Sequence, residues 1–455
     1  MTALAKQDST GAEGFTGGAY LSRFAAARAT LPGAGLPWLA SLREEAIERF
    51  AEHGFPTRRV EEWKFTNLSK LTKSVFAEAR PAANGITQEA LAPLGLEGAP
   101  THLMVFVNGR FRGDLSDIGS LPDGVTITSL AQTLESDPAL IEKHLVGAAR
   151  SFDAGRAQAL ASLNAAFMTD GAVIRLDEGT APERPVHLLF LALPEENPTF
   201  VHPRNLFLAE AGACATVIET YAGLSERPYW TNAVTQVVAA EDAGINHFKL
   251  QAESLSAFHI ASTEVVLDRN AYYASFVMSV GGELSRHEIR VRFAGEGVHC
   301  ALKGASLARG RQHMDNLTRI DHLKPNGVTN EVYKSVVDDR AHAVFQGKLR
   351  VAPGAQKTNA YQLNQNLLLS EKAQADSKPE LEILADDVKC SHGATVGELD
   401  KEALFYLRSR GLDESAARGL LIEAFVGELI DGIGMSPVRA HFRKAFARWL
   451  AGQHG

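Results

Sequence analysis

Cysteine is scarce in this sequence, and long hydrophobic runs are missing from it. Only three cysteines occur among 455 residues, at Cys214, Cys300 and Cys390, and none belongs to a C-x-x-C pair. This excludes a disulfide framework and agrees with a reducing compartment. No apolar stretch approaches the roughly 18 residues that span a membrane. Residues 1–20 also lack the basic and hydrophobic segments of a secretory signal. We therefore expect a cytoplasmic protein with no membrane contact.

An excess of positive charge and several compact enzyme motifs are also absent. The formal net charge is -8, which disfavours general binding to nucleic acid. The sequence contains no G-x-x-x-x-G-K-[ST] phosphate loop, no G-x-S-x-G elbow and no H-E-x-x-H helix. We expect that this chain binds no nucleotide, and that any nucleotide hydrolysis it depends on occurs in another chain.

The remaining composition is that of an ordinary globular protein, with 45% hydrophobic and 22% charged residues. Helical spacing of apolar residues alternates with β-rich segments along the chain. An Asn108-Gly109 pair between two apolar runs predicts a short hairpin within the N-terminal helical part. We predict four segments: a disordered N-terminus at 1–20, a helical region with the hairpin at 21–170, a β core at 171–398, and a helical region at 399–455.

The β core alternates polar and apolar side chains, as in "SRHEIRVRF" at 285–293. Ile289, Val291 and Phe293 would face a dry side, and the even-numbered charged residues a wet side. The wet set is Arg286, Glu288, Arg290 and Arg292.

Turn-like centres recur through the β core at intervals that begin with 32, 26 and 27 residues. They lie at Gly212, Gly244, Asn270, Gly297, Arg340 and Gly354. Intervals of this size are typical of stacked solenoid coils. A sandwich or jelly roll would give a similar strand pattern, so the spacing favours a solenoid without excluding them.

The C-terminal region predicts two amphipathic helices, the first capped by Asp413. Their apolar stripes either pack on the chain's own core or receive a partner. The main members of these stripes are Leu420, Leu421, Phe425, Phe442 and Phe446.

The stretch "DDVKCSHGATVG" at 386–397 holds the strongest candidate site. Cys390 and His392 lie two positions apart in a strand-like segment, so their side chains share one face. This is the last β run before the C-terminal helices, and its inner face would lie at the open end of a stack. Structural zinc and iron–sulfur clusters generally need about four ligands, so a pair is half a site. The other ligands would come from a partner, unless the metal is only passing through or the pair is simply structural.

Other chemically competent residues have simpler interpretations. The pairs Asp338-Asp339 and Asp386-Asp387 would suit a carbohydrate-active β-helix enzyme only if carboxylates aligned on one outer face, and turn formation is the usual role of such residues. We interpret Cys214 and Cys300 as core residues. His313 and His322 are interpreted as solvated loop residues, although both are further candidates for the site at Cys390 and His392.

Several long motifs resemble the SufB/SufD family of the SUF iron–sulfur cluster assembly machinery. They are "RRVEEWKFTNLSKL" at 58–71, "NEVYKSVVDDRAHAVFQGKLRV" at 330–351, "AQKTNAYQLNQNLLLS" at 355–370 and "KPELEILADDVKCSHGATVGELDKEALFYLRSRGL" at 378–412. The last of these resembles the SufD branch most closely. A SufB-like subunit is the alternative, but SufB typically carries a Glu-His-Glu run near the position of Cys390-Ser391-His392, and this chain has none.

The resemblance implies a mainly β fold, a right-handed parallel β-helix between helical ends, and a scaffold that is not itself an enzyme. It implies pairing with SufB and docking of the SufC ATPase on the C-terminal helical region. It also implies that Cys390 and His392 take part in a transient iron or iron–sulfur cluster site shared with SufB. A homodimer would be the form taken without partners, and a self-contained homodimeric module that binds no metal remains a rival interpretation.

Overall fold

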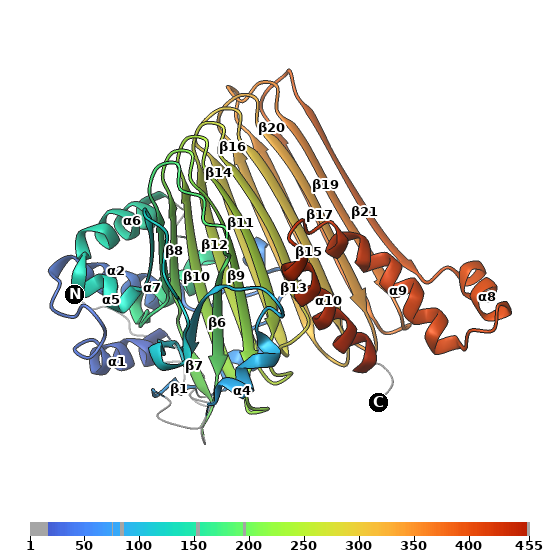
Figure 1. Cartoon of the computed structure of the whole chain (residues 1–455), viewed down its shortest axis with the longest axis horizontal. Helices are drawn as coiled ribbons and strands as arrows, with labels where there is room; N and C mark the ends of the chain where they lie inside the picture. The colour runs from blue at the N-terminus through green and yellow to red at the C-terminus, as the bar shows by residue number, and fades with distance from the viewer. Residues whose placement is uncertain (1–16, 75, 82–85, 152–154, 194–196, 453–455) are drawn as a thin grey trace, which may run out of the picture.

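The dominant feature of the computed structural model is a stack of long strands with helices at both ends (Figure 1). The structure describes residues 17–74, 76–81, 86–151, 155–193 and 197–452. The strands form two sheets, A and B. Sheet A has the order β20-β18-β16-β14-β12-β10-β8-β5-β4, with β7 and β1 on a side path, and sheet B has the order β21-β19-β17-β15-β13-β11-β9-β6-β2-β3.

The strand bounds are as follows. Sheet A and its side path contain β1 (Ala77–Glu78), β4 (Val125–Ser129), β5 (Ala172–Leu176), β7 (Thr199–Val201), β8 (Arg204–Ala209), β10 (Tyr229–Ala239), β12 (Phe258–Leu267), β14 (Leu284–Phe293), β16 (His313–His322), β18 (His342–Val351) and β20 (Gln374–Ile383). Sheet B contains β2 (His102–Val107), β3 (Arg110–Phe111), β6 (Val186–Ala192), β9 (Cys214–Gly223), β11 (Gly244–Ala252), β13 (Tyr272–Ser279), β15 (His299–Ala308), β17 (Val328–Val337), β19 (Asn359–Leu368) and β21 (Lys389–Glu398).

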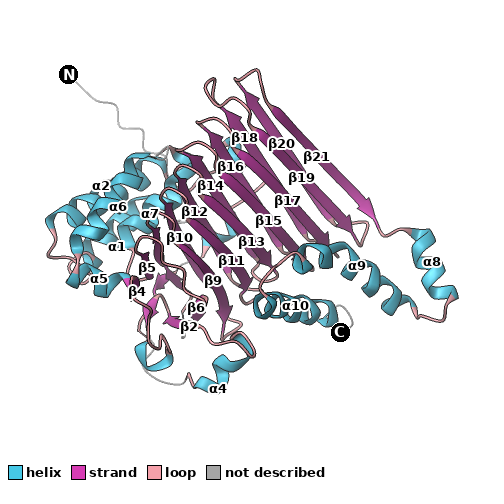
Figure 2. Cartoon of the chain, turned by 45° about the horizontal axis from the view of Figure 1, so that its top comes forward, coloured by secondary structure: helices cyan, strands magenta, loops and turns pink. Residues whose placement is uncertain are grey.

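Successive strands from β8 onward alternate between the two sheets and pair in parallel with the strand of the coil before. The chain therefore winds from one sheet to the other as a β-solenoid of about seven turns (Figure 2). This confirms the predicted solenoid and removes the sandwich and the jelly roll. Only β2 with β3 and β4 with β5 pair antiparallel among the described strands.

Ten α-helices lie outside the coils in the described part of the chain. They are α1 (Gly17–Ala27), α2 (Pro37–His53), α3 (Ser69–Lys73), α4 (Gln88–Leu91), α5 (Leu130–Ser136), α6 (Pro138–Ser151), α7 (Ala159–Phe167), α8 (Lys401–Ser409), α9 (Glu414–Asp431) and α10 (Ser436–Ala451). Asp413 caps α9 as predicted, because its side chain accepts a hydrogen bond from the Ala416 amide at 2.8 Å. Among the described residues, no helix is both long and apolar enough to cross a membrane.

In the six successive coils from β8–β9 to β18–β19, the turn from sheet A to sheet B contains a residue with positive φ, and these residues recur every 27 to 31 positions. They are Gly212, Asp242, Asn270, Gly297, Asn326 and Lys357. Three of the predicted centres were therefore misplaced. Asp242 and Lys357 hold this conformation instead of Gly244 and Gly354, and near Arg340 it is Asp339, in the opposite turn from sheet B to sheet A, that has positive φ. Gly244 begins β11, where a Cβ would lie 1.8 Å from the Tyr272 ring, so its role is close packing between coils.

Helices and an N-terminal segment cover much of the outer surface of both sheets. On sheet A, Arg286, Glu288 and Arg290 are buried, so the predicted wet face is wrong there. The Trp63 ring lies 4.0 Å from the Arg286 guanidinium, and the Glu62 carbonyl accepts a hydrogen bond from it at 2.8 Å. Glu62 and Trp63, which cover β14, precede it by more than 200 positions. The alternation of polar and apolar residues within β14 therefore could not predict that it is covered.

The change from coils to C-terminal helices lies between β21 and α8. The coils end with β21 at Glu398, and α8 begins at Lys401. The N-terminal boundary differs, because α1 begins at Gly17 and Tyr20 is already buried, while residues 1–16 lie outside the described residues. The predicted hairpin is present as β2 and β3, but β2 pairs with β6 and so opens sheet B.

Candidate functional site at the open end of the solenoid

Cys390 and His392 lie on β21, the last strand of sheet B. Their register partners on β19 are Ala360 and Gln362, which are fully buried in the interior of the solenoid. Because register partners in a parallel sheet point to the same side, Cys390 and His392 also face the interior. The predicted shared orientation is thus observed. No described coil follows β21, so Cys390 is only half-buried and His392 is exposed.

The thiol of Cys390 is not activated within this chain. Burial raises its pKa, and a backbone hydrogen bond from Ala360 offsets that rise only in part. A protonated thiol is a poor ligand, so binding would require a metal or a neighbouring cation to displace the proton. Within the described ranges, no cluster of three or more His, Cys, Asp or Glu side chains could hold a metal ion. The pair therefore offers two ligands at an open surface, as the sequence predicted, and its ligand role stays a prediction.

Two residues that the sequence analysis missed line the interior directly beneath His392. Register places Glu331 of β17 beside Gln362 of β19, and Gln362 beside His392 of β21, in one column across three neighbouring strands. Both Glu331 and Gln362 are fully buried, and Gln362 Nε2 donates a hydrogen bond to Glu331 Oε2 at 2.6 Å. Burial raises the pKa of Glu331 to about 7, partly offset by Gln362 and Thr318.

The other cysteines lie away from this site. Cys300 shares a column with Cys390 but lies three strands deeper, which corresponds to about 14 Å. It is 3% exposed, and burial raises the pKa of its thiol well above the usual value. Cys214 begins β9 near the opposite end of the stack. The position of Cys300 agrees with the core role predicted for it, whereas Cys214 is only partly buried and lies outside the hydrophobic core.

His313 and His322 are not solvated loop residues, and that interpretation was wrong. Both lie on β16, where His313 Nε2 is 2.8 Å from the Thr66 hydroxyl and His322 Nε2 is 2.9 Å from the Thr329 hydroxyl. Burial lowers the pKa of each imidazole to about 4. Neither histidine is in the column beneath Cys390 or His392.

The acidic pairs form turns at the ends of strands. Asp339 has a φ of 54° in the turn between β17 and β18, and its side chain accepts a hydrogen bond from the Gly310 amide at 2.9 Å. Asp387 lies between β20 and β21, where its carbonyl accepts a hydrogen bond from the Lys357 amide at 2.6 Å. These contacts account for the Asp pairs as turn formers.

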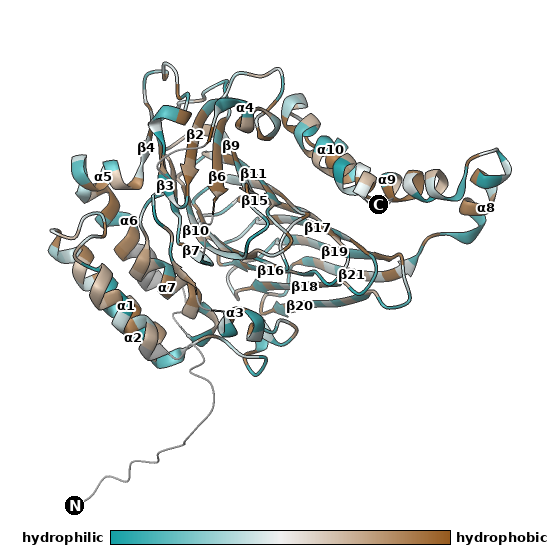
Figure 3. Cartoon of the chain, turned by 90° about the horizontal axis from the view of Figure 1, so that it is seen from below, coloured by the Kyte–Doolittle hydropathy of each residue, from teal (hydrophilic) through white to brown (hydrophobic). Residues whose placement is uncertain are grey.

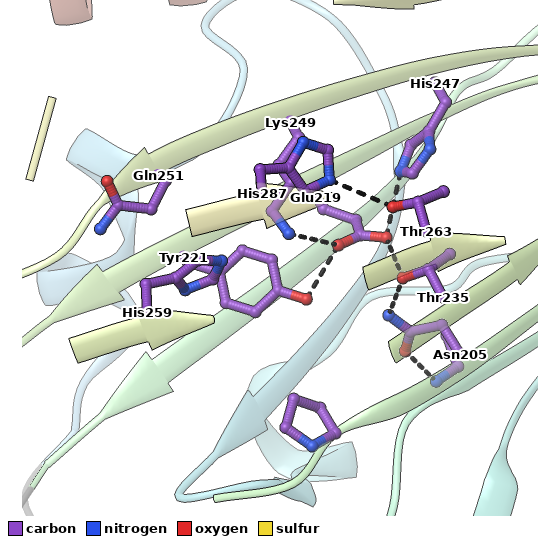
Figure 4. Close-up of polar contacts among 12 residues, drawn as sticks. Asn205, Glu219, Tyr221, Thr235, His247, Lys249, Gln251, His259, Thr263 and His287 are labelled. Carbon is purple, nitrogen blue, oxygen red and sulfur yellow. Dashed lines mark hydrogen bonds and ion pairs between the residues drawn. The ribbon is translucent and has the colours of Figure 1, made fainter. Parts of the chain in front are cut away.

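A second polar cluster lies inside the early coils (Figure 4). The Glu219 carboxylate accepts hydrogen bonds from Tyr221 and Thr235 at 2.8 Å each, lies 3.0 Å from His247 Nε2, and is 3.8 Å from Lys249 Nζ. Burial alone would raise the pKa of Glu219, but the His247 hydrogen bond and the Lys249 charge outweigh it and place the pKa below its usual range. The carboxylate is satisfied by these partners, and about five strand spacings, roughly 24 Å, separate β11 from β21.

The predicted partner-binding residues divide into two groups. Leu420 is 46% exposed, and Leu421 and Phe425 are half-buried. Phe442 and Phe446 are buried, and Phe442 packs edge-on to Phe276 of sheet B with ring centroids 5.0 Å apart. A direct contact of these two aromatic residues with a partner is therefore inconsistent with their positions.

An outward apolar surface nevertheless remains on the C-terminal helices. The preceding helix α8 extends away from the sheets (Figure 3) and carries Phe405 at 75% and Tyr406 at 56% exposure. These two side chains and Leu420 are the exposed large apolar residues of α8 and α9, and we call this set the outer helical face. Its exposure leaves it free to bind another chain.

Comparisons with known proteins match nearly all of the described chain. The family model described as SUF system FeS cluster assembly, SufBD core domain, matches residues 191–425. The model of the SufBD protein N-terminal region matches residues 16–188. The chain belongs to the SufBD family. Both Cys390 and His392 lie within the matched core domain.

Relatives in the SufBD family include proteins named as iron–sulfur cluster assembly components. An iron–sulfur cluster assembly SufBD family protein of Synechocystis is 36% identical over 414 residues, covering 89% of this chain and 90% of the relative. The iron–sulfur cluster assembly protein SufD of Escherichia coli is 33% identical, covering 86% and 88%. SufD of Bacillus subtilis is 27% identical, covering 88% and 92%. The predicted family is thereby confirmed, and the chain is a SufBD family protein of iron–sulfur cluster assembly with SufD homologues.

Proposed function

We propose that this chain is a SufD-type scaffold subunit, itself without catalytic activity, that pairs with a SufB-type chain across the open end of its solenoid. In this proposal, Cys390 and His392 supply part of a transient iron or iron–sulfur cluster site, and the partner supplies the other ligands. A thiolate and an imidazole are both suitable ligands for iron. The observation that carries the proposal is the position of this pair on the inner face of a terminal strand, where another chain can reach it.

The surroundings of β21 support an interface at the same place. A terminal strand presents backbone groups that can pair with another strand, and native proteins usually protect such edges. Here the edge is long, at 10 residues. Exposed apolar side chains surround it, namely Tyr361, Ile383, Leu384 and Val396. A second stacked sheet could continue the ladder and cover these side chains.

The outer helical face supports docking of a SufC-type ATPase. Phe405, Tyr406 and Leu420 are exposed on α8 and α9, and large exposed apolar patches commonly mark protein interfaces. The ATPase would hydrolyse the nucleotide, a reaction for which this sequence has no motif. The assembly would work in the cytoplasm.

The test is to replace Cys390 and His392 by alanine in the complex of this chain with its SufB-type and SufC-type partners. We expect iron and sulfide bound per complex to fall by at least about tenfold, since loss even of groups that only support metal ligands commonly costs that much affinity. Cys214→Ser is the matched control, because Cys214 lies on β9, six strands away from β21 in sheet B. Its complex should keep full iron and sulfide.

Size-exclusion chromatography with light scattering separates the two parts of the proposal. An intact complex with unchanged cluster content after both alanine substitutions would remove the pair from the mechanism and leave the scaffold role. A chain that never co-purifies with either partner would overturn the scaffold role itself.

A further inference from the structure

Glu331 and Gln362 occupy the wall directly behind the open-end site, and Gln362 has unused hydrogen-bonding capacity. Their side chains are 0% exposed and bonded to each other. Glu331 also interacts with Thr318, whereas Gln362 Oε1 is buried without a hydrogen-bond partner among the described residues. Leaving a buried acceptor unpaired is destabilising, so such a group calls for an explanation, and a functional role is one of them.

The opposite sheet is shaped to seat the Gln362 amide. Gly347 of β18 faces Gln362 across the interior, and a Cβ at Gly347 would lie 2.1 Å from Gln362 Nε2. Any other residue at this position would displace the amide. The glycine therefore makes room for this side chain, in the same way that Gly304 makes room for Tyr333.

The hydrogen bond to Glu331 fixes which way the amide points. When Glu331 is ionised it only accepts hydrogen bonds, so it selects the NH2 group of Gln362 rather than its oxygen. Because an amide is planar, turning Nε2 towards β17 directs Oε1 away from β17. The next residue outward in the column is His392 on β21. Its side chain is exposed and lies one strand spacing, about 4.8 Å, from Gln362.

We propose that Glu331 and Gln362 are positioning residues for His392: Glu331 holds the Gln362 amide, and Gln362 Oε1 accepts the hydrogen of one imidazole nitrogen of His392. The other ring nitrogen then carries the lone pair and faces the ligand that it shares with Cys390. Histidine ligands commonly donate their second nitrogen to such an acceptor, which fixes both tautomer and ring orientation. This inference deepens the proposed function and rests on it for the identity of the ligand.

The test measures the tautomer of His392 in the isolated full-length chain, with no iron present. Nitrogen-15 spectra of histidine-labelled protein distinguish the two neutral tautomers. His392→Asn identifies the His392 signal among the 15 histidines. Spectra are recorded at alkaline pH, where the imidazole is neutral and Glu331 is ionised. We expect one tautomer in the wild type, and a mixture of both in Gln362→Met and in Glu331→Gln.

Asn364→Leu provides the matched control. Asn364 is equally buried on the same strand, but its register partner on β21 is Ala394 instead of His392. This variant loses a buried amide of similar size and should keep the single wild-type tautomer. The same mixture in wild type and in both column variants would overturn the proposal, as would a change of equal size in Asn364→Leu. If Gln362→Met fails to fold, Glu331→Gln alone decides, since it preserves the side-chain volume.

The positioning role and the proposed function can be disproved independently of each other. The tautomer is measured without iron, so it does not depend on whether Cys390 and His392 ever bind a cluster. A failure of the proposed function would appear as full iron and sulfide content in the His392→Ala complex. A failure of the positioning role would appear as an unchanged tautomer in both column variants.

Discussion

Glu331 makes a pH-dependent contribution to stability, because it is a carboxyl group enclosed by the coils. Burial raises its pKa from 4.5 to about 7. A group whose pKa is higher in the folded chain holds its proton more tightly there than in the unfolded chain. The stability that this proton contributes is complete below about pH 4.5 and is lost as the pH rises through 7. A shift of this size corresponds to roughly 3 kcal/mol. We expect the stability difference between Glu331→Gln and wild type to move by that amount, in favour of the variant, between pH 4.5 and 8.

Urea midpoints at several pH values measure this difference, and Glu44→Gln is the control. Glu44 has the same side chain as Glu331, but it is 53% exposed. Glu44→Gln therefore makes the same chemical change at the surface. A stability difference for Glu331→Gln that stays constant from pH 4.5 to 8 would show that Glu331 is ionised throughout, and would contradict the prediction.

Residue-scale expectations from the sequence held where they depended on one strand alone. The alternation rule put Cys390 and His392 on one face, and chain order put them at the end of the stack. Glu331 and Gln362 escaped notice because their relation to His392 depends on coil lengths of 31 and 30 residues, which set the register between neighbouring coils. The positive φ of Lys357 is similarly a property of the coil turn and not of the residue type.

The C-terminal helices have one face that stabilises the chain and another that is open, and a pair of substitutions should separate them. Phe442 of α10 is 0% exposed against sheet B, whereas Leu420 of α9 is 46% exposed. Phe442→Ala should lower the free energy of unfolding by about 3–5 kcal/mol, since it leaves a cavity. Leu420→Ala should change it by no more than about 0.5 kcal/mol. Urea denaturation of the two variants measures both effects.

The same pair separates packing from partner binding. Under the proposed function, Leu420→Ala should reduce the amount of SufC-type ATPase retained in the complex while the chain remains fully folded. Phe442→Ala should reduce the amount of retained ATPase only in proportion to the fraction of the chain that is unfolded. Equal loss of stability in both variants would contradict the division into inner and outer faces. The sequence showed that α9 is amphipathic, but α9 has apolar residues on more than one side, and only the structure shows that Ile422, Val426 and Ile430 face the sheet.

At the scale of the whole molecule, the N-terminal region and the solenoid form one unit rather than two domains. The segment around Glu62 and Trp63 reaches across the outer face of sheet A, where the Glu62 carbonyl accepts hydrogen bonds from Arg286 at 2.8 Å and from Gln346 at 3.0 Å. Strands β14 and β18 are thereby tied to the same short segment. The sequence suggested a boundary near residue 170 because helical periodicity gives way to strand periodicity there. Composition cannot show that the N-terminal residues wrap back over strands that come more than 200 residues later.

Trp63→Ala tests this unity. The Trp63 side chain is 2% exposed, donates a hydrogen bond to the Ala157 carbonyl at 3.2 Å, and covers the buried Arg286 guanidinium. Removing it leaves a cavity and lets water reach that charge, at a cost of about 3–5 kcal/mol. We expect one cooperative unfolding transition at a lower midpoint. We also expect faster amide hydrogen exchange in β14, β16 and β18, although the substitution lies far from them in sequence.

Leu134→Ala is the control for Trp63→Ala, because Leu134 is equally buried but packs against Val173 and Leu208 in the first coil. Its effect on exchange should remain near β5 and β8, since distant sites in a stack are coupled mainly through neighbouring coils. If Trp63→Ala instead speeds exchange only before residue 170, or splits unfolding into two transitions, the N-terminal region behaves as a separate domain. The solenoid alone would then have to stabilise the buried charges on sheet A. This independence from the N-terminal region would show first at Arg286, which has Asp315 and Glu288 as its own acidic partners.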